Sequence, residues 1–342
     1  MLGEGKVSKH GPLKINELVT PLRGEVGVLQ QLITKQKQRG IGAQDILTFM
    51  AVRNELLRLP AVLEHYRRIG VDRFFIVDNG SSDGTRDFLS AQDDVDLFAT
   101  EGSYAESKFG MDWLHTLMDR FANGHWILNI DADELFIYPH HENTTLKRLC
   151  AFLDRTRSTA MLSILLDMYS DKAIDQTTYR CGGSLLETCP YFDGGPYKIL
   201  RSQLFPHVEL RGGPRARVFW DANTGFFSPT VSKVPLVKWV TGCRYISGQH
   251  YMEGPLSLSN LTGALLHFKF LHDFCVRATE ESTREEHFAS AREYKLYKRK
   301  LDEQQGLTLY YSGSIRYRDS GQLIAGKIIR TLPAFEEYVQ NC

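Results

Sequence analysis

The sequence predicts an α/β protein with a mostly parallel central sheet and helices on both faces, and three observations support this. Between residues 46 and 131, short apolar runs alternate with stretches in which apolar residues recur at helical spacing. The apolar runs are continuous, which is typical of strands buried on both faces. Polar residues end several of these runs, and ligands of such sheets bind beyond the carboxyl ends of the strands.

The element order follows from periodicity and from the residues that begin and end helices. Pro60 suits the first turn of a helix, and Gly70 suits its end. The expected strands are residues 46–52, 73–78, 95–100 and 125–131. The expected helices are residues 60–70, a short helix with Phe88 and Leu89, residues 103–122, a helix at 25–38 and a charged helix at 283–305.

The overall composition excludes several classes of protein. The formal net charge is zero, so we expect no nucleic-acid partner. No apolar stretch approaches 18 residues, and the first residues lack the apolar core of a signal peptide. The six cysteines form no C-x-x-C pair, which favours reduced thiols in a cytoplasmic protein.

The stretch HWILNIDADEL, residues 125–135, brings three acids together after an apolar run. With 41 acids in the chain, such spacing is weak by itself, and a solvated turn is the alternative. If the strand continues, Asp131 and Asp133 point to the same side. Two nearby carboxylates need a cation between them, and Mg²⁺ or Mn²⁺ with diphosphate oxygens would provide it.

Other polar residues follow the first two expected strands. Arg53 and Glu55 end the first, and Asp78 ends the second, where it suits hydrogen bonds from a ribose or a base. The turn VDNGSSDGT lacks both G-x-G-x-x-G and G-x-x-x-x-G-K-[ST], so dinucleotide and P-loop sites are not expected.

The stretch MAVRNELLRLPAVLEHYRRIGVDRFFIVDNGSSDGT, followed by ILNIDADELF, resembles family 2 glycosyltransferases, and most closely the soluble bacterial family 2-like branch. The resemblance covers roughly residues 46–140 and extends weakly to GPYKILR and LLHFKF. It implies the GT-A fold, a three-layer α/β/α sandwich. The implied divisions are an N-terminal extension (1–44), a nucleotide-sugar-binding half (45–158), an acceptor-binding half (159–275) and a C-terminal helical segment (276–342).

The resemblance also implies an activity, namely transfer of a sugar from a nucleotide diphosphate donor to a hydroxyl of a glycan or lipid-linked acceptor. We expect inversion, Mn²⁺ or Mg²⁺ dependence, non-processive action and a role in bacterial surface polysaccharide synthesis. Carried over by motif, the site residues are Glu55 and Asp78 at the nucleoside, Asp83 in the turn lining the site, Lys108 at the donor, and Asp131 and Asp133 at the metal and phosphates, with Arg53 beside Glu55.

The second half offers candidates for the remaining roles. The acid that takes the acceptor proton is not recognisable among Glu187, Asp193, Glu209 and Asp221, and Asp193, beside flexible glycines, is preferred. In RGGPRARVFW, Arg215 between Arg211 and Arg217 could close over a diphosphate, or the loop could be an exposed basic one.

A third metal ligand is expected from a histidine late in the chain. His267 lies in an apolar, strand-like run and is preferred over His250, which lies in a more open stretch; a third option is that neither binds metal. Lys269, two residues on, would point the same way and suits a diphosphate.

Two other functions remain open at this point. One is a sugar-phosphate nucleotidyltransferase, although MAVRNELLRLP lacks the glycine-rich loop usual after its first strand. The other is an inactive GT-A module that binds a glycan or partner, against which the intact D-x-D argues. The charged helix at 283–305 either touches the acidic inner membrane surface or is simply solvated.

Overall fold

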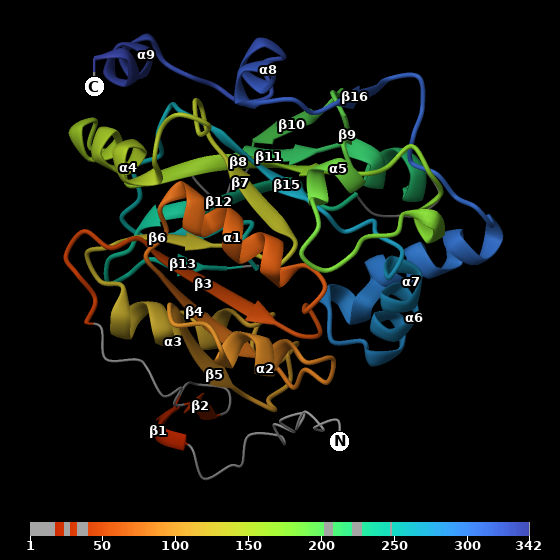
Figure 1. The fold of residues 1–342 in the computed structure, drawn as a ribbon, viewed down its shortest axis with the longest axis horizontal. Helices are drawn as coiled ribbons and strands as arrows, with labels where there is room; N and C mark the ends of the chain where they lie inside the picture. Colours follow the sequence, from red (N-terminus) through yellow and green to blue (C-terminus); the bar gives the residue numbers. More distant parts are fainter. Residues whose placement is uncertain are drawn as a thin grey trace, which may run out of the picture.

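A computed structural model describes residues 18–23, 28–32, 40–201, 208–220, 228–246 and 248–341, with the backbone alone for 18–23 and 28–32. Ten described strands form one sheet in the order β1-β2-β5-β4-β3-β6-β12-β8-β15-β7 (Figure 1). They are β1 Leu18–Arg23, β2 Val28–Leu32, β3 Leu47–Val52, β4 Arg73–Asp78, β5 Val95–Ala99, β6 Trp126–Asn129, β7 Glu134–Ile137, β8 Ala160–Asp167, β12 Ser232–Lys238 and β15 Gly263–His267.

Short strands and helices complete the described chain. The small antiparallel pairs are β10 Lys198–Arg201 with β11 Val208–Arg211, β13 Arg244–Tyr245 with β14 Met252–Glu253, and β9 Tyr191–Asp193 with β16 Ser314–Arg316. The helices are α1 Leu59–Ile69, α2 Thr85–Ser90, α3 Met111–Phe121, α4 Leu146–Arg155, α5 Leu185–Thr188, α6 Phe274–Arg284, α7 Phe288–Glu303, α8 Ser320–Ala325 and α9 Pro333–Gln340, with a 3₁₀ turn Ile174–Gln176 and a π-helical turn Arg215–Phe219.

The sheet is mostly parallel in direction. β5, β4, β3 and β6 pair in parallel, and so do β8 and β15. β12 lies antiparallel between β6 and β8, so the two parallel groups share one direction. β7 pairs antiparallel with β15 at the edge. The two halves expected from the sequence meet at residue 159. Because β7 of the first half pairs with β15 of the second, both contribute strands to one continuous sheet.

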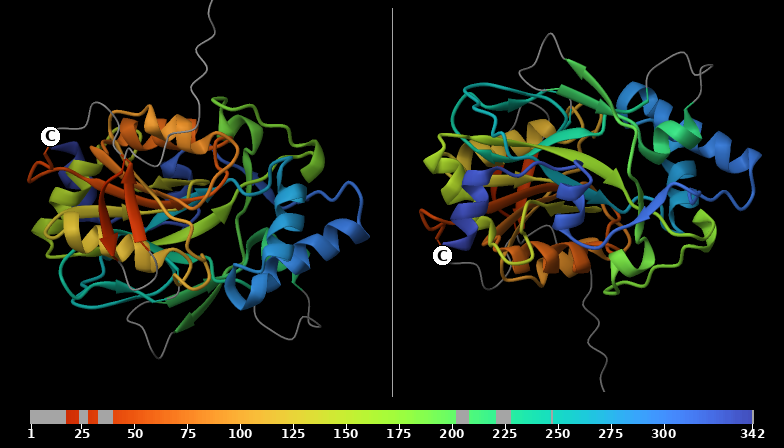
Figure 2. Two further views of the ribbon diagram at one scale, coloured as in Figure 1. Left: turned by 90° about the horizontal axis from the view of Figure 1, so that it is seen from below. Right: turned by 90° about the horizontal axis from the view of Figure 1, so that it is seen from above.

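Helices cover both faces of this sheet, which confirms the predicted α/β sandwich (Figure 2). On one face, Leu63 and Tyr66 of α1 pack in the same core as Leu149 of α4. On the other face, Leu114 and Leu117 of α3 pack against the sheet with the segment that includes β13 and β14. The apolar spacing that predicted α1 and α3 therefore marks the faces they bury.

A third, smaller apolar cluster joins α6 and α7, which lie beside the sheet in Figure 1. The fully buried Arg58, just before α1, fastens α6 to the sheet. Its guanidinium donates two hydrogen bonds of 2.7 Å to Asp273 and one of 3.1 Å to the carbonyl of Phe268. This bidentate pair fixes α6 close to the end of β15.

Three expectations about local structure were wrong. Part of the helix expected at 25–38 is the strand β2, which pairs with β5 at Gln30 and Gln31; the flanking residues 25–27 and 33–38 lie outside the described chain. α3 begins at Met111, since Lys108, Phe109 and Gly110 have positive φ. The charged helix at 283–305 is two helices, because Glu285 ends α6 with φ 57°.

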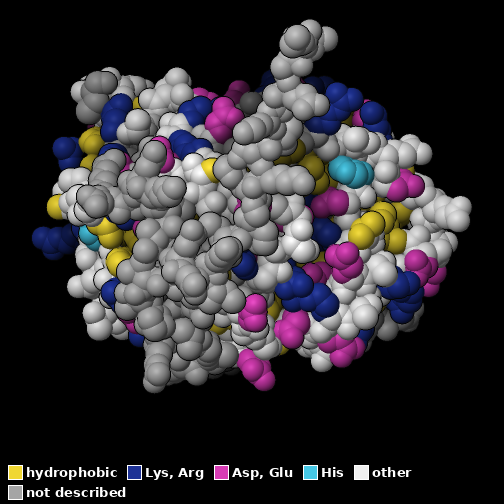
Figure 3. Space-filling model, turned by 60° about the horizontal axis from the view of Figure 1, so that its bottom comes forward, with side chains coloured by type: hydrophobic (Ala, Val, Ile, Leu, Met, Phe, Trp, Pro, Cys, Tyr) yellow, Lys and Arg dark blue, Asp and Glu magenta, His cyan; other side chains and the backbone are white. Residues whose placement is uncertain are grey.

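The surface agrees with the zero net charge of the chain. On the face drawn in Figure 3, basic and acidic side chains are interspersed over the described residues. Within the described ranges, no helix combines the length and apolar character needed to cross a membrane.

Candidate active site

A cleft of about 560 Å³ opens where β3, β4, β6 and β15 end. Arg53 and Asn79 line it just after β3 and β4, and Arg277 of α6 and Tyr294 of α7 line it as well. The cleft therefore occupies the expected edge of a largely parallel sheet.

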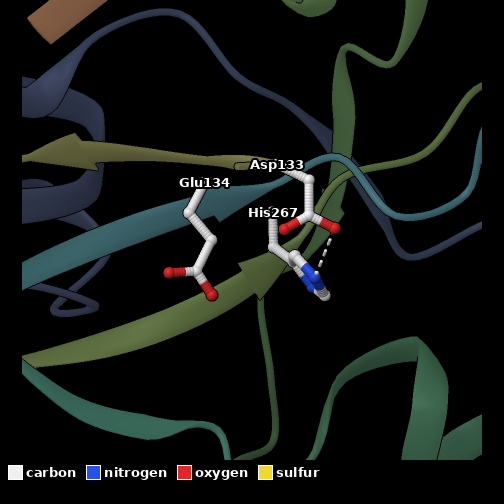
Figure 4. A group of neighbouring side chains, drawn as sticks. All are labelled: Asp133, Glu134 and His267. Carbon is white, nitrogen blue, oxygen red and sulfur yellow. Dashed lines mark ion pairs between the residues drawn. The ribbon is translucent and has the colours of Figure 1, made fainter. Parts of the chain in front are cut away.

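Sheet register brings the central residues together. His267 ends β15, where it lies opposite Glu134 of β7 and opposite Asp167 of β8. Its Nδ1 is 2.6 Å from Oδ1 of Asp167, and its Nε2 is 3.2 Å from Oδ2 of Asp133. Figure 4 shows the Asp133 carboxylate directed at the imidazole. Each ring nitrogen of His267 thus contacts one carboxylate.

These contacts set the protonation states of His267, Asp133 and Asp167. Burial would lower the pKa of His267, but Asp133 and Asp167 outweigh it and raise this pKa to about 9. Burial likewise opposes ionisation of Asp167, yet Arg215 and His267 lower its pKa to about 2. His267 also lowers the pKa of Asp133 well below its usual value, against the effect of burial. The imidazole is therefore cationic at neutral pH, between two ionised carboxylates.

Asp133 and His267, with Glu134 beside them, fit a divalent metal. Ligand atoms of Asp133, Glu134 and His267 all lie within 4.8 Å of one another. Neighbouring ligands of an octahedral ion at about 2.1 Å lie about 3 Å apart. The 3.2 Å between Asp133 and His267 matches this spacing. Carboxylate oxygen and imidazole nitrogen suit first-row ions such as Mn²⁺.

Asp131 and Glu134 are held differently from Asp133, by the buried Lys233 of β12. The Lys233 ammonium lies 2.7 Å from Oδ2 of Asp131 and also donates to Oε1 of Glu134. Burial raises the pKa of Glu134 to about 7, although Lys233 opposes it. β6 ends at Asn129, so Asp131 and Asp133 lie in the turn before β7. The strand does not continue through them, so strand alternation does not set the directions of these two carboxylates, although both line the cleft.

Two cations lie in the cleft near His267. Lys269 donates to the hydroxyl of Tyr294 at 3.2 Å, and among the described residues no carboxylate lies within 4.0 Å of its ammonium. Arg215 is only 5% exposed and pairs through Nε with Asp167 at 2.8 Å. Its Nη2 is buried without a hydrogen-bond partner in the described chain. Both groups retain N–H donors for an anion.

The cleft unites many, but not all, of the residues singled out by sequence. The predicted residues that line it are Arg53, Glu55, Asp131, Asp133, Arg211, Arg215, His250 and His267, with Lys269. Glu55 is buried, and its carboxylate accepts hydrogen bonds of 2.5 and 3.1 Å from Arg277. Arg215 is buried within a π-helical turn, so the alternative of an exposed basic loop does not hold for this residue.

Asp78 and Asp83 support the turn and do not line the cleft. Asp78 is fully buried and accepts hydrogen bonds from Arg86 at 2.6 and 2.8 Å. Asp83 accepts from the backbone N–H groups of Leu56 and Thr85 at 3.1 and 2.9 Å. These two bonds close the turn between β4 and α2.

Lys108 and Asp193 also lie outside the cleft lining. Lys108 is exposed, pairs with Asp112 at 2.9 Å and precedes α3. Asp193 is buried and accepts two hydrogen bonds, of 2.9 and 3.0 Å, from Arg217. Of the other acids weighed as the base, Glu187 is exposed, Glu209 pairs with Arg211, and Asp221 lies outside the described residues.

His250 lines the cleft, but its Nδ1 lies 2.9 Å from the carbonyl of Ser232. Burial lowers its pKa to about 4, so it is neutral. The described metal-ligand group includes His267 and not His250.

Sequence reasoning missed Lys233 and Asp167. A lysine inside the apolar run VSKVPL is a signal, because buried lysines need partners. Asp167 follows the apolar run SILL, just as Asp131 follows an apolar run, but no function was predicted for it from the sequence.

Comparisons with known proteins add little. No protein-family model matches the chain, and no curated protein matches it. Among solved structures, HddC from Yersinia pseudotuberculosis aligns at TM-score 0.26 and 9% identity over 67% of this chain and 79% of that one. A 4-diphosphocytidyl-2C-methyl-D-erythritol synthase aligns at TM-score 0.25 and 14% identity over 83% and 97%. Likenesses this weak inform neither family nor function.

Proposed function

We propose that this chain is a divalent-metal-dependent glycosyltransferase that moves a sugar from a nucleotide diphosphate donor to an acceptor hydroxyl. One observation carries the proposal. A donor pair suited to a metal, Asp133 and His267, lies in one cleft with two cations that have unused N–H groups, Lys269 and Arg215. A metal with adjacent cations is the arrangement that a diphosphate requires.

Asp133 and His267 would hold the ion, which would stabilise the negative charge of the departing diphosphate. Lys269 and Arg215 would donate hydrogen bonds to phosphate oxygens, since neither uses all of its N–H groups on the chain. Asp167 acts through His267, whose ring it orients from the buried side.

The turn after β3 favours sugar transfer over the competing nucleotidyl transfer. A triphosphate is usually cradled by free backbone N–H groups. Here the N–H groups of Asn54, Glu55 and Leu56 donate to side chains of the next loop, which are Ser81, Thr85 and Asp83. This turn therefore offers no cradle among those three groups.

The acceptor proton needs a carboxylate that lines the cleft, and Glu293 of α7 is the best placed. Both carboxylate oxygens of Glu55 and of Glu281 accept from an arginine. In Glu293, among the described residues, Oε1 alone accepts, from Arg215 at 3.4 Å and from the hydroxyl of Tyr297. Burial would raise the pKa of Glu293, but Lys269 and Arg215 keep it below its usual value. We propose Glu293 as the base, with a glycan or lipid-linked hydroxyl as its substrate.

The test compares two reactions in parallel with purified protein and Mn²⁺. One set of samples contains UDP-, GDP-, CMP- or dTDP-sugars with sugar acceptors, and release of the free nucleotide is measured. The other contains nucleoside triphosphates with sugar 1-phosphates, and release of pyrophosphate is measured. Free nucleotide release that EDTA abolishes supports the proposal. Pyrophosphate release would assign nucleotidyl transfer instead, and metal-independent binding of a glycan without turnover would indicate an inactive module.

A further inference from the structure

The ammonium of Lys233 lies between the two acids that flank Asp133. Lys233 is only 3% exposed and lies on β12, between β6 and β8. Its three N–H groups meet three acceptors, which are Asp131 at 2.7 Å, Glu134, and the side-chain oxygen of Gln249 at 3.1 Å. Lys233 therefore has no donor left for a substrate.

Each carboxylate oxygen of Asp131 and Glu134 also accepts a hydrogen bond from the protein. Oδ1 of Asp131 accepts from Nε2 of Gln249 at 2.8 Å, and Oδ2 accepts from Lys233. In Glu134, Oε1 accepts from Lys233 and Oε2 accepts from the backbone N–H of Asp131 at 3.3 Å. Asp133 differs, because within the described chain its carboxylate pairs with His267 alone.

Electrostatics explains why an ammonium lies there. The buried Glu134 and the half-exposed Asp131 would repel each other without a cation between them, which a bridging divalent ion or an ammonium can provide. A second metal ion would have to share these carboxylates with the adjacent ammonium of Lys233, whose positive charge repels it. Since β12 places Lys233 there permanently, this cation does not depend on metal in solution.

We propose that Lys233 is a fixed internal counter-cation and positioning residue, which reserves Asp131 and Glu134 and limits the site to one divalent ion, at Asp133 and His267. The inference deepens the proposed function and rests on its metal dependence. It also separates this site from two-ion sites, in which paired carboxylates bridge neighbouring metals.

The experiment counts Mn²⁺ ions bound to the purified full chain, by electron paramagnetic resonance and by calorimetry. Each titration is run with Mn²⁺ alone and with Mn²⁺ plus UDP. We expect one ion per chain for the unmodified protein and two for Lys233→Met, whose freed carboxylates can bind a second. Lys238→Met is the matched control, because Lys238 lies on the same strand but pairs with Asp154 near the surface. We expect one ion for that variant.

Two ions in the unmodified protein would overturn the inference, and so would a folded Lys233→Met that still binds one ion with unchanged affinity. Circular dichroism shows whether that variant folds; if it does not, the count in the unmodified protein decides alone. Other outcomes test the proposed glycosyltransferase activity separately from the role of Lys233. One bound ion without donor turnover rejects the glycosyltransferase and keeps the role of Lys233, whereas absence of any bound ion rejects both.

Discussion

Nδ1 of His267 lies 2.6 Å from Oδ1 of Asp167, across the parallel pair β15 and β8. The register sets this contact, because the two residues face each other at the ends of adjacent strands. Nδ1 is thereby committed to the buried side, and Nε2 points to Asp133. The fold thus fixes which nitrogen can face a metal.

The first expectation follows from this contact. Asp167→Asn should weaken Mn²⁺ binding by about 10- to 100-fold, the usual effect of losing the partner of a metal-bound histidine. Calorimetry in the absence of nucleotide measures it. Asp171→Asn is a fitting control, since Asp171 is exposed just beyond the same strand. Unchanged Mn²⁺ affinity in Asp167→Asn would separate His267 from the metal.

Metal binding should also depend on pH in a defined direction. The folded-state pKa of His267 is about 9, above its ordinary 6.5, because Asp133 and Asp167 outweigh burial. The bound proton therefore stabilises the metal-free protein below pH 6.5, and this contribution is lost as the pH rises through 9. Since a metal must displace that proton, Mn²⁺ affinity should rise about tenfold per pH unit up to 9.

Titrations at pH 6.5, 7.5 and 8.5 test this dependence. The variant His267→Gln should bind Mn²⁺ weakly and with little change over that range. Equal affinity of the unmodified protein at pH 6.5 and 8.5 would show that His267 is not a ligand.

Much of the fold was predictable because its signals are local. Apolar periodicity between residues 46 and 131, with Pro60 and Gly70, placed β3, α1, β4, α2 and β5 close to their observed bounds. Here each helix and strand buries its own apolar face, so pattern and structure agree. α3 began late because Lys108 and Phe109 adopt positive φ, a backbone choice that composition does not reveal.

The site was predictable only in part, because its partners are distant in sequence. The polar turn at Asp131–Asp133 and the strand-like setting of His267 gave local signals. The pairing of Glu55 with Arg277 spans 222 residues, and that of Lys233 with Asp131 spans 102. Such contacts depend on strand order and register, which one sequence does not state.

Lys269 and Lys108 should differ in their contribution to UDP binding. Lys269 lines the cleft beside His267, and Lys108 is exposed and paired with Asp112. Lys269→Ala should therefore weaken UDP binding by about tenfold, as loss of a charge-assisted hydrogen bond to phosphate predicts. Lys108→Ala should change it less than twofold. Calorimetry with Mn²⁺ and UDP measures both, and the reverse order would restore the donor contact expected of Lys108.

Asp78 should contribute to the stability of the fold and not to nucleotide binding. Asp78→Ala removes a fully buried carboxylate that holds Arg86 and the N–H of Ser81, so we expect a loss of about 2 kcal/mol in unfolding free energy. Urea denaturation measures it, with the exposed Asp87→Ala as control. Nucleotide affinity should stay within about twofold. A large loss of affinity at unchanged stability would instead support the nucleoside contact expected from sequence.

The acceptor base gives the final comparison, between Asp193 and Glu293. A base must lie within hydrogen-bond reach of the proton it takes. Asp193 is committed to Arg217 and to Tyr169, whose hydroxyl donates at 2.6 Å, and it does not line the cleft. Glu293 does line it. Glu293→Gln should therefore lower kcat by about 100-fold or more, with donor KM within a few-fold, as loss of proton transfer predicts.

Asp193→Asn should lower the melting temperature and leave kcat within about twofold, since its carboxylate neutralises Arg217 and accepts from Tyr169. Both variants are assayed with the donor that supports turnover, and each melting curve is recorded with Mn²⁺ and UDP. If Asp193→Asn keeps its melting temperature and loses kcat while Glu293→Gln stays active, the base is Asp193. Strand β9 would then have to move toward the cleft during turnover, because Asp193 pairs with Arg217 in this structure.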